Sequence, residues 1–364
     1  MNSVKLIERL SNAFGPSGFE DDVISVASEY AKGFANLTES NIRNLYIKPK
    51  QAAKARPGRP SKQVKPVVMI DAHSDEVGFM VHSVMPNGML KIHPLGGWMP
   101  AMLPSSTVMI KNIDGELVRG VIASIPPHYR SEAERSRAPE VSDLMVDIGS
   151  SSDAQTKEEF KIRIGSPMMP DVKFSYNSNT GMMLGKAFVD RLGCACVLET
   201  IKKLSGENLD VEIVGTLTSQ EEVGLRGAAV AANTVKPDIA IFFEGCPADD
   251  YFLQGHMSQT ALRGGPMLRH IDDKMITNPR FQRFALNIAE EKGIPVQEAI
   301  RKGGSTNAGP VHISREGVPC IVIGIPVRYI HSHNSYATIE DYNASVELAA
   351  EVIRKLNYGV VSKF

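Results

Sequence analysis

The sequence contains little cysteine, with four residues in a chain of 364. So few cysteines in so long a chain cannot form a disulfide framework, and none has the CxxC spacing of a structural zinc site. We therefore expect four buried, reduced thiols: Cys194, Cys196, Cys246 and Cys320.

An excess of charge of one sign is also missing, because 40 basic residues stand against 41 acidic ones and the formal net charge is -1. Binding to nucleic-acid phosphates depends on a basic surface, so this balance argues against nucleic acid as a partner. No apolar run reaches the roughly 18 residues of a membrane-spanning helix, and residues 1–15 are typical of an amphipathic helix rather than a signal peptide. The sequence predicts a soluble, cytoplasmic protein without a membrane partner.

What is present is a large hydrophobic fraction, 43% of the residues, in a pattern that alternates between strands and helices. Continuous apolar runs predict buried strands at residues 67–71, 211–217, 239–243 and 320–325. Helical periodicity predicts helices at residues 3–12, 20–34, 194–204 and 228–233. The predicted fold class is α/β, a doubly wound and mostly parallel sheet flanked by helices, with catalytic residues at the carboxyl ends of the strands.

Residues 79–180 show a different pattern, with short alternating strands, several Gly and Pro turns and little helical signal. They predict a small all-β domain inserted into the α/β domain, which then comprises residues 1–78 and 181–364. The segment 48–66 carries four prolines and, beyond Lys48, six basic residues without apolar periodicity. It is typical of an exposed loop between two strands, and we assign it no function.

Residues that can bind a metal ion follow the predicted strands. His73 and Asp75 come directly after the run at 67–71 and lie on the same side of an extended chain. His73 can bind a metal ion while Asp75 orients its imidazole. A lone His-x-Asp triplet is a weak signal, because a histidine at a strand end is often a structural polar residue. Whether His73 binds a metal ion therefore depends on the residues that follow the other predicted strands.

Two adjacent carboxylates, Glu221 and Glu222, follow the strand at 211–217. One can bind a metal ion while the other accepts a proton from water whose pKa the ion has lowered. The alternative is a solvated pair at the start of the next helix, where acidic residues interact favourably with the helix dipole.

Further candidates follow the two remaining core strands. Glu244 directly follows the run at 239–243, where a buried carboxylate is costly unless it is paired or coordinated. His331 and His333 follow the run at 320–325, and the pattern does not choose between them. Histidine and carboxylates at four strand ends make up the mixed nitrogen and oxygen set that zinc, cobalt or manganese hydrolases use.

Seven segments match the motifs of one known family: 15–20 (GPSGFE), 71–79 (DAHSDEVGF), 95–98 (LGGW), 147–149 (DIG), 185–188 (GKAF), 221–227 (EEVGLRG) and 328–332 (RYIHS). Through them the chain resembles, over nearly its whole length, the tetrahedral aminopeptidases. These are cytoplasmic dinuclear metallopeptidases that include glutamyl and deblocking aminopeptidases and many proteins mislabelled as endoglucanases.

The resemblance implies a metal-dependent aminopeptidase that hydrolyses N-terminal residues from short peptides, with two divalent ions (zinc, cobalt or manganese) as cofactors. It implies that Glu221 is the general base, that His73 and Glu244 bind one ion, and that Glu222 and His331 bind the other. His333 matches no family role. The resemblance also implies that the inserted β domain mediates dimerisation and that dimers assemble into a hollow tetrahedral dodecamer with inward-facing sites.

The chain departs from this family at three positions. The family bridges its two ions with the first residue of an Asp-[Asp or Asn]-Arg triplet, where this chain has Val189, Asp190 and Arg191. Valine cannot coordinate, so either Asp190 becomes the bridging ligand or the site binds one ion or none. Glu244 replaces the usual Asp, which indicates a reshaped site. Asn307 replaces an Asp of a glycine-rich loop, which bears on substrate selectivity.

Two other functions stay open at this stage. Paired carboxylates without a metal ion can hydrolyse glycosides, although the histidines at the strand ends are then unexplained. Alternatively, the chain is a non-catalytic member of the family, which still forms the oligomer but has lost its metal site through Val189.

Overall fold

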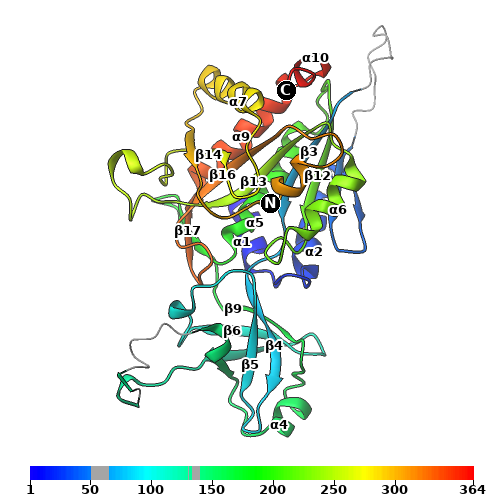
Figure 1. The fold of residues 1–364 in the computed structure, drawn as a ribbon. Coiled ribbons are helices and arrows are strands. Elements are labelled where there is room, and N and C mark those ends of the chain that lie inside the picture. Colours follow the sequence, from blue (N-terminus) through cyan, green and yellow to red (C-terminus); the bar gives the residue numbers. More distant parts are fainter. Residues whose placement is uncertain (51–64, 130, 133–139) are drawn as a thin grey trace.

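The computed structural model describes residues 1–50, 65–129, 131–132 and 140–364. Its main element is an eight-stranded mixed sheet in the order β1-β2-β12-β3-β13-β16-β14-β15 (Figure 1). These strands are β1 (Ala35–Glu39), β2 (Leu45–Pro49), β3 (Val67–His73), β12 (Glu212–Thr218), β13 (Ile239–Pro247), β14 (Met267–Ile271), β15 (Gln297–Ile300) and β16 (Cys320–Val327). The four central strands β12, β3, β13 and β16 are parallel neighbours, so their carboxyl ends meet at one edge.

Helices cover both faces of this sheet, and the predicted α/β fold class is confirmed. The helices are α1 (Ser3–Asn12), α2 (Asp21–Ala31), α5 (Phe188–Leu204), α6 (Arg226–Val235), α7 (Pro279–Lys292), α8 (Ala308–His312), α9 (Ile339–Lys355) and α10 (Tyr358–Val361). Local signals set their ends. The Asn2 side chain accepts the Lys5 amide at 2.9 Å to begin α1, and Gly293, at φ 65°, ends α7.

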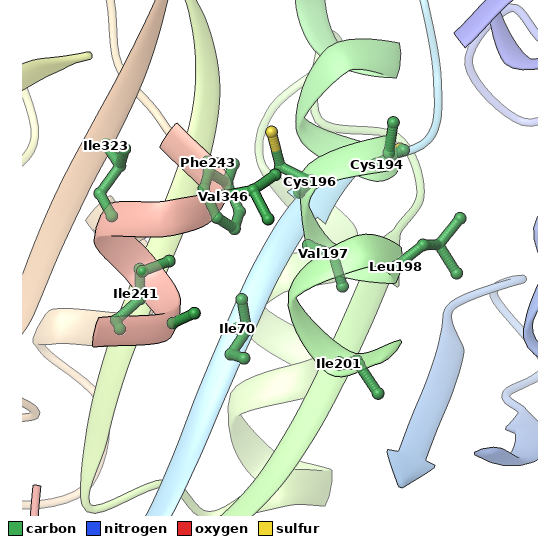
Figure 2. Packing of buried hydrophobic residues seen from close by; sticks show 14 of the residues in the cluster. Ile70, Cys194, Cys196, Val197, Leu198, Ile201, Ile241, Phe243, Ile323 and Val346 are labelled. Carbon is green, nitrogen blue, oxygen red and sulfur yellow. The ribbon is translucent and has the colours of Figure 1, made fainter. Parts of the chain in front are cut away.

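The central strands bury side chains on both faces because successive residues alternate. On one face Ile70, Ile241 and Phe243 pack against α5 and α9 (Figure 2). On the other face Met69 and Phe242 pack with residues of α6 and α8. Burial on both faces accounts for the continuous apolar runs of the sequence and holds the strand ends in fixed positions.

A closed barrel forms from six strands in the order β4-β5-β8-β7-β6-β9. They are β4 (Gly78–Val84), β5 (Leu90–Leu95), β6 (Thr107–Lys111), β7 (Leu117–Ile122), β8 (Met145–Asp147) and β9 (Pro167–Pro170), with α4 (Asp153–Glu158) between β8 and β9. Phe79, Val81, Ile110 and Val146 belong to its own buried core. Figure 1 shows the barrel at one end of the molecule, away from the large sheet.

A small third sheet lies where the chain returns from the barrel. β10 (Ser175–Asn177) pairs with β11 (Met182–Gly185), which pairs with β17 (Ser335–Thr338). β10 falls inside the segment 79–180, so the domain boundaries at 78 and 181 stay a prediction. Of the basic segment 48–66, residues 51–64 lie outside the described residues. No helix in the described ranges is long and apolar enough to cross a bilayer.

All four cysteines are free and buried. Burial raises the pKa of Cys246 to about 12 and raises the pKa of the other three thiols above the usual value. We expect iodoacetamide at pH 8 to leave the native thiols unlabelled and to label all four after unfolding, because only an exposed thiolate reacts. Intact-mass spectrometry measures this. Labelling of the folded protein at the rate of free cysteine would contradict the burial described here.

Candidate active site

Strand register brings the first candidate ligands level with one another. In the parallel pair β12 and β3, Thr218 lies beside His73. In the pair β13 and β3, Phe242 lies beside Asp71. Glu244 comes two residues after Phe242, as His73 comes two residues after Asp71, so both point to the same face of the sheet. The adjacent strands therefore place an imidazole and a carboxylate side by side at the carboxyl edge.

His73, Glu221 and Glu244 form a compact group whose ligand atoms all lie within 4.8 Å of one another. His73 Nε2 is 3.9 Å from Glu221 Oε2 and 3.8 Å from Glu244 Oε1. The other ring nitrogen, Nδ1, is 3.3 Å from Asp75 Oδ1. A proton on Nδ1 leaves the lone pair of Nε2 facing the two glutamates. His73 is fully buried, and its Nε2 has no hydrogen-bond partner.

The electrostatics of this group favour a cation among its members. Burial raises the pKa of Glu221 to about 8 and also raises the pKa of Glu244, although His73 opposes both shifts. Burial alone would lower the pKa of His73, but Glu221, Asp75 and Glu244 outweigh it and raise that pKa well above its usual value. Like charges so close together repel one another unless a cation neutralises them. One nitrogen and several carboxylate oxygens suit zinc, cobalt or manganese.

Glu222 and His331 form a second pair beside the first group. His331 Nε2 is 3.5 Å from Glu222 Oε1, which is buried and has no hydrogen-bond partner. Burial raises the pKa of Glu222 to about 7. The His331 side chain is 35% exposed, whereas His73 is fully buried. This pair therefore borders solvent, and the His73 group lies inside the protein.

Asp190 is fully buried at the irregular start of α5. Its Oδ1 accepts the backbone amides of Gly193 and Gly245, both at 3.0 Å, whereas Oδ2 has no partner. Burial raises the pKa of Asp190. Among the described residues, Asp190 does not join the compact group of three ligands. The neighbouring Val189 packs against β13, with Cγ2 2.8 Å from where a Cβ on Gly245 would lie.

Asn307 lies beneath the site rather than at its surface. Its Nδ2 donates to Asp71 Oδ2 at 2.8 Å and to Thr218 Oγ1 at 2.7 Å. Thr216 also donates to Asp71, at 2.5 Å, yet burial raises the pKa of Asp71 to about 7. These bonds tie the loop before α8 to β3 and β12. An effect of Asn307 on selectivity stays a prediction.

The barrel contributes a loop to the pair of Glu222 and His331. A Cβ atom on Gly96 would lie 3.1 Å from Glu222 Oε2, and one on Gly97 would lie 3.4 Å from His331 Nδ1. Gly96 also has φ of +81°, a conformation that other residues rarely adopt. The LGGW segment thus lets the barrel backbone approach the site closely.

His333, for which the sequence suggested no family role, contacts the barrel. Its Nε2 is 3.1 Å from the Thr107 carbonyl oxygen, and its ring centroid is 5.8 Å from that of Trp98. Trp98 stacks on Phe79 of β4 at 4.8 Å. The structure therefore separates the two late histidines: His331 faces Glu222, and His333 joins the two parts of the molecule.

Sequence reasoning named Asp75 only as a partner of His73, and it missed both the second role of Asp75 and the role of Glu20 in holding the glutamate pair in place. Asp75 accepts the backbone amides of Glu221, at 2.9 Å, and of Glu222, at 3.1 Å. Glu20 accepts the amide of Gln220 at 3.1 Å. Glu20 belongs to the segment GPSGFE, whose likeness to the family was the available signal. Glu20 directly precedes Asp21 and Asp22 in the first turn of α2, and acidic residues at a helix start are typical of a solvated helix end. The sequence pattern alone therefore did not indicate that Glu20 holds Gln220.

Comparison with known proteins identifies the family. Residues 57–348 match the family described as M42 glutamyl aminopeptidase. The glutamyl aminopeptidase of Lactococcus lactis subsp. cremoris is 33% identical over 293 residues, covering 80% of this chain and 81% of that protein. The crystal structure of the TET aminopeptidase from the marine sediment archaeon Thaumarchaeota archaeon SCGC AB-539-E09 is 35% identical, with 99% of each chain covered and a TM-score of 0.92.

A more distant structure has the same fold. The Pyrococcus horikoshii TET1 peptidase, described as able to assemble into a tetrahedron or a large octahedral shell, is 24% identical. The match covers 98% of this chain and 100% of that one, with a TM-score of 0.84. The family match spans both the barrel and the central strands that carry the site. The chain belongs to the M42 glutamyl aminopeptidase family and is a metal-dependent aminopeptidase.

Proposed function

We propose that this aminopeptidase hydrolyses N-terminal residues from short peptides at the carboxyl edge of the sheet, with two divalent ions, zinc, cobalt or manganese. The observation that carries the proposal is the buried, unpartnered Nε2 of His73, 3.9 Å and 3.8 Å from two buried glutamates. The family match favours peptide hydrolysis over the glycoside alternative.

The two ions would have different surroundings. His73 and Glu244 would hold one ion in the buried group, and Glu222 and His331 would hold the other near solvent. The free Nε2 of His73 and the free Oε1 of Glu222 support these assignments, because a buried polar atom without a partner is costly. A bound divalent ion supplies Lewis-acid chemistry, lowering the pKa of water and polarising the scissile carbonyl.

Glu221 would be the general base. Asp75 holds Glu221 by its backbone amide, which leaves the carboxylate free to accept a proton at Oε1 or Oε2. The side chain lies at the buried edge of the site with 8% of the residue exposed, which limits competing contact with water. The same carboxylate would then return the proton to the leaving amine.

Asp190 is our candidate for the ligand shared by the two ions. Its Oδ2 is buried and unpartnered, whereas Oδ1 is already occupied by two backbone amides. Val189 occupies the position where the family has its bridging Asp, and its methyl groups cannot coordinate a metal ion. If Asp190 does not reach the ions, the two halves of the site have no common ligand, and the second ion would bind weakly.

The assembly is also a proposal. We propose that the inserted β domain, residues 79–180, mediates a homodimer, and that dimers form a dodecamer of the tetrahedral kind. The fold shared with the P. horikoshii TET1 peptidase supports this idea. A cytoplasmic location stays a prediction from the sequence.

Removal of the metal ions tests the function directly. We expect dialysis against a strong chelator to abolish hydrolysis of short peptides, and addition of zinc, cobalt or manganese to restore it. Release of N-terminal residues is measured by mass spectrometry beside the metal content, with a glucan as the control substrate. Full peptidase activity in metal-free protein, or cleavage of the glucan, would contradict the proposal.

The Glu221→Gln variant separates the base from the ligands. We expect turnover to fall by about 10²- to 10⁴-fold while metal content stays near that of the wild type, because proton transfer is lost and coordination is kept. Glu222→Gln is the matched comparison and should lose metal. If Glu221→Gln also loses metal, Glu221 is a ligand, and the two glutamates have exchanged roles.

The Asp190→Asn variant tests the shared ligand. Asn keeps the Oδ1 acceptor for Gly193 and Gly245 but replaces the free Oδ2 with an NH₂ group that cannot coordinate. We expect binding of both metal ions to collapse, as measured by elemental analysis, with little change in melting temperature. Asp190→Ala should lose the metal ions as well, and stability in addition.

Val189→Asp is the reciprocal test. If Asp190 is shared between the ions, a second carboxylate should change activity little or crowd the site. The opposite pair of results is a silent Asp190→Asn variant and a Val189→Asp variant that gains metal and peptidase activity. That pair of results would show that Asp190 is not the shared ligand and that the native site is depleted of metal.

A further inference from the structure

Two buried carboxylates hold three consecutive backbone amides just before and within the glutamate pair. Glu20 Oε1 accepts the amide of Gln220 at 3.1 Å. Asp75 Oδ1 accepts the amide of Glu221 at 2.9 Å, and Asp75 Oδ2 accepts that of Glu222 at 3.1 Å. Glu20 and Asp75 are both fully buried. The turn after β12 is therefore fixed by its backbone, not by the side chains that perform the chemistry.

This turn needs an outside restraint because its conformation is unusual. Gln220 has φ of +56°, which a residue with a side chain rarely adopts. Beyond it, two neighbouring side chains reach different targets, since Glu221 faces His73 and Glu222 faces His331. Without Glu20 and Asp75 as acceptors, the three backbone amides would lose these hydrogen bonds, which is unfavourable where a donor is shielded from water.

The restraint comes from the N-terminal segment 15–20. Ser17 Oγ donates to Asp75 Oδ2 at 2.6 Å, so this segment supports both carboxylates of the turn. The segment is itself anchored at Gly15, whose carbonyl oxygen accepts the Glu76 amide at 3.0 Å and the guanidinium of Arg191 at 3.1 Å.

Glu20 does not act as an ordinary helix cap. It precedes α2, but its side chain makes no capping bond to that helix. Its Oε1 instead accepts the amides of Gly18, at 2.8 Å, and Gln220. Its Oε2 is buried and has no partner. Burial, reinforced by Asp75, raises the pKa of Glu20 to about 7. A neutral amide with the same shape should therefore be tolerated there.

We infer that Glu20 is a positioning residue for catalysis: with Ser17 it fixes the turn at 219–222 and so aims Glu221 and Glu222 at their separate targets. The inference rests on the proposed roles of Glu221 and Glu222. It assigns a function to the segment GPSGFE, which lies 200 positions away from the turn that it holds.

Three variants test this role. Glu20→Ala removes the acceptor, Glu20→Gln keeps it, and Ser17→Ala removes only the hydroxyl that supports Asp75. The control for Glu20→Ala is Asp341→Ala, because Asp341 is a buried acid that accepts two backbone amides of another segment, those of Arg263 and Gly265.

The control for Ser17→Ala is Ser11→Ala. Ser11 is fully buried and donates a hydrogen bond to the carbonyl oxygen of Lys186 at 2.7 Å, but it does not contact the turn. Each variant is measured for melting temperature, for affinity towards cobalt without substrate, and for kcat and KM on a short peptide.

We expect Glu20→Ala to lower kcat and cobalt affinity by about 10- to 100-fold, as loss of a supporting partner typically does at a metal site. Glu20→Gln should stay close to wild type. Asp341→Ala should lower the melting temperature without changing cobalt affinity. If Glu20→Ala does not fold, the comparison of Ser17→Ala with Ser11→Ala tests the inference instead. The kcat of Ser17→Ala should then be lower than that of Ser11→Ala.

The inference is overturned if Glu20→Ala folds with wild-type kcat and cobalt affinity, or if Glu20→Gln is as damaged as Glu20→Ala. It is overturned equally if Ser17→Ala matches Ser11→Ala in both measurements. Cobalt affinity is measured without turnover. A wild-type protein that binds cobalt but cleaves no peptide would therefore refute the proposed function and leave the positioning of the turn still measurable.

Discussion

Asp75 is the buried acceptor that connects both halves of the candidate active site. It faces His73 Nδ1 and accepts the amides of Glu221 and Glu222, so one carboxylate sets the positions of three functional residues. Burial on its own would raise the pKa of Asp75, but hydrogen bonds from His73, Ser17 and Glu221 outweigh it and lower that pKa. Hydrogen bonds to a charged group contribute about 1.5–3 kcal/mol each, which offsets the cost of burying the charge.

The same water-poor environment makes the candidate ligands dependent on a cation. Glu221, Glu222, Glu244 and Asp190 all have raised pKa values because burial disfavours their charged forms. A divalent ion reverses this balance by favouring the carboxylates. Val189 takes no part in this balance, because its apolar side chain packs against β13, the strand that carries Glu244. The candidate site comprises a compact buried group of His73, Glu221 and Glu244 beside the pair of Glu222 and His331, in which only the side chain of His331 is partly exposed.

The walls of the site come from three distant parts of the chain. Strands β3 and β13 of the large sheet carry the candidate ligands His73 and Glu244. The N-terminal segment contacts the turn at 219–222, and the barrel brings Gly96 and Gly97 against Glu222 and His331. His333 ties the loop that carries His331 to the barrel through Thr107. The barrel is therefore a wall of the candidate site as well as a candidate dimerisation surface. A change in the position of the barrel would alter the surroundings of Glu222 and His331.

Much of this could be predicted from the sequence, because strands and the polar residues that end them are local features. The apolar runs predicted the central strands, and with them the α/β class and the candidates His73, Glu221, Glu222 and Glu244 at one edge. The motifs also identified the family. A change of periodicity at residues 79–180 indicated a separate β region, where the structure has the barrel. The domain boundaries at 78 and 181 stay a prediction.

What the sequence by itself determined is the order of the elements and the kinds of ligand that follow each strand. Only the tertiary structure decided that His333 contacts the barrel, that Asp190 has one oxygen bound and one free, and that Glu20 supports Gln220. The physical reason is distance along the chain. These contacts join residues separated by up to 226 positions, and their partners are chosen by how sheet, barrel and N-terminal segment pack, which no local pattern records.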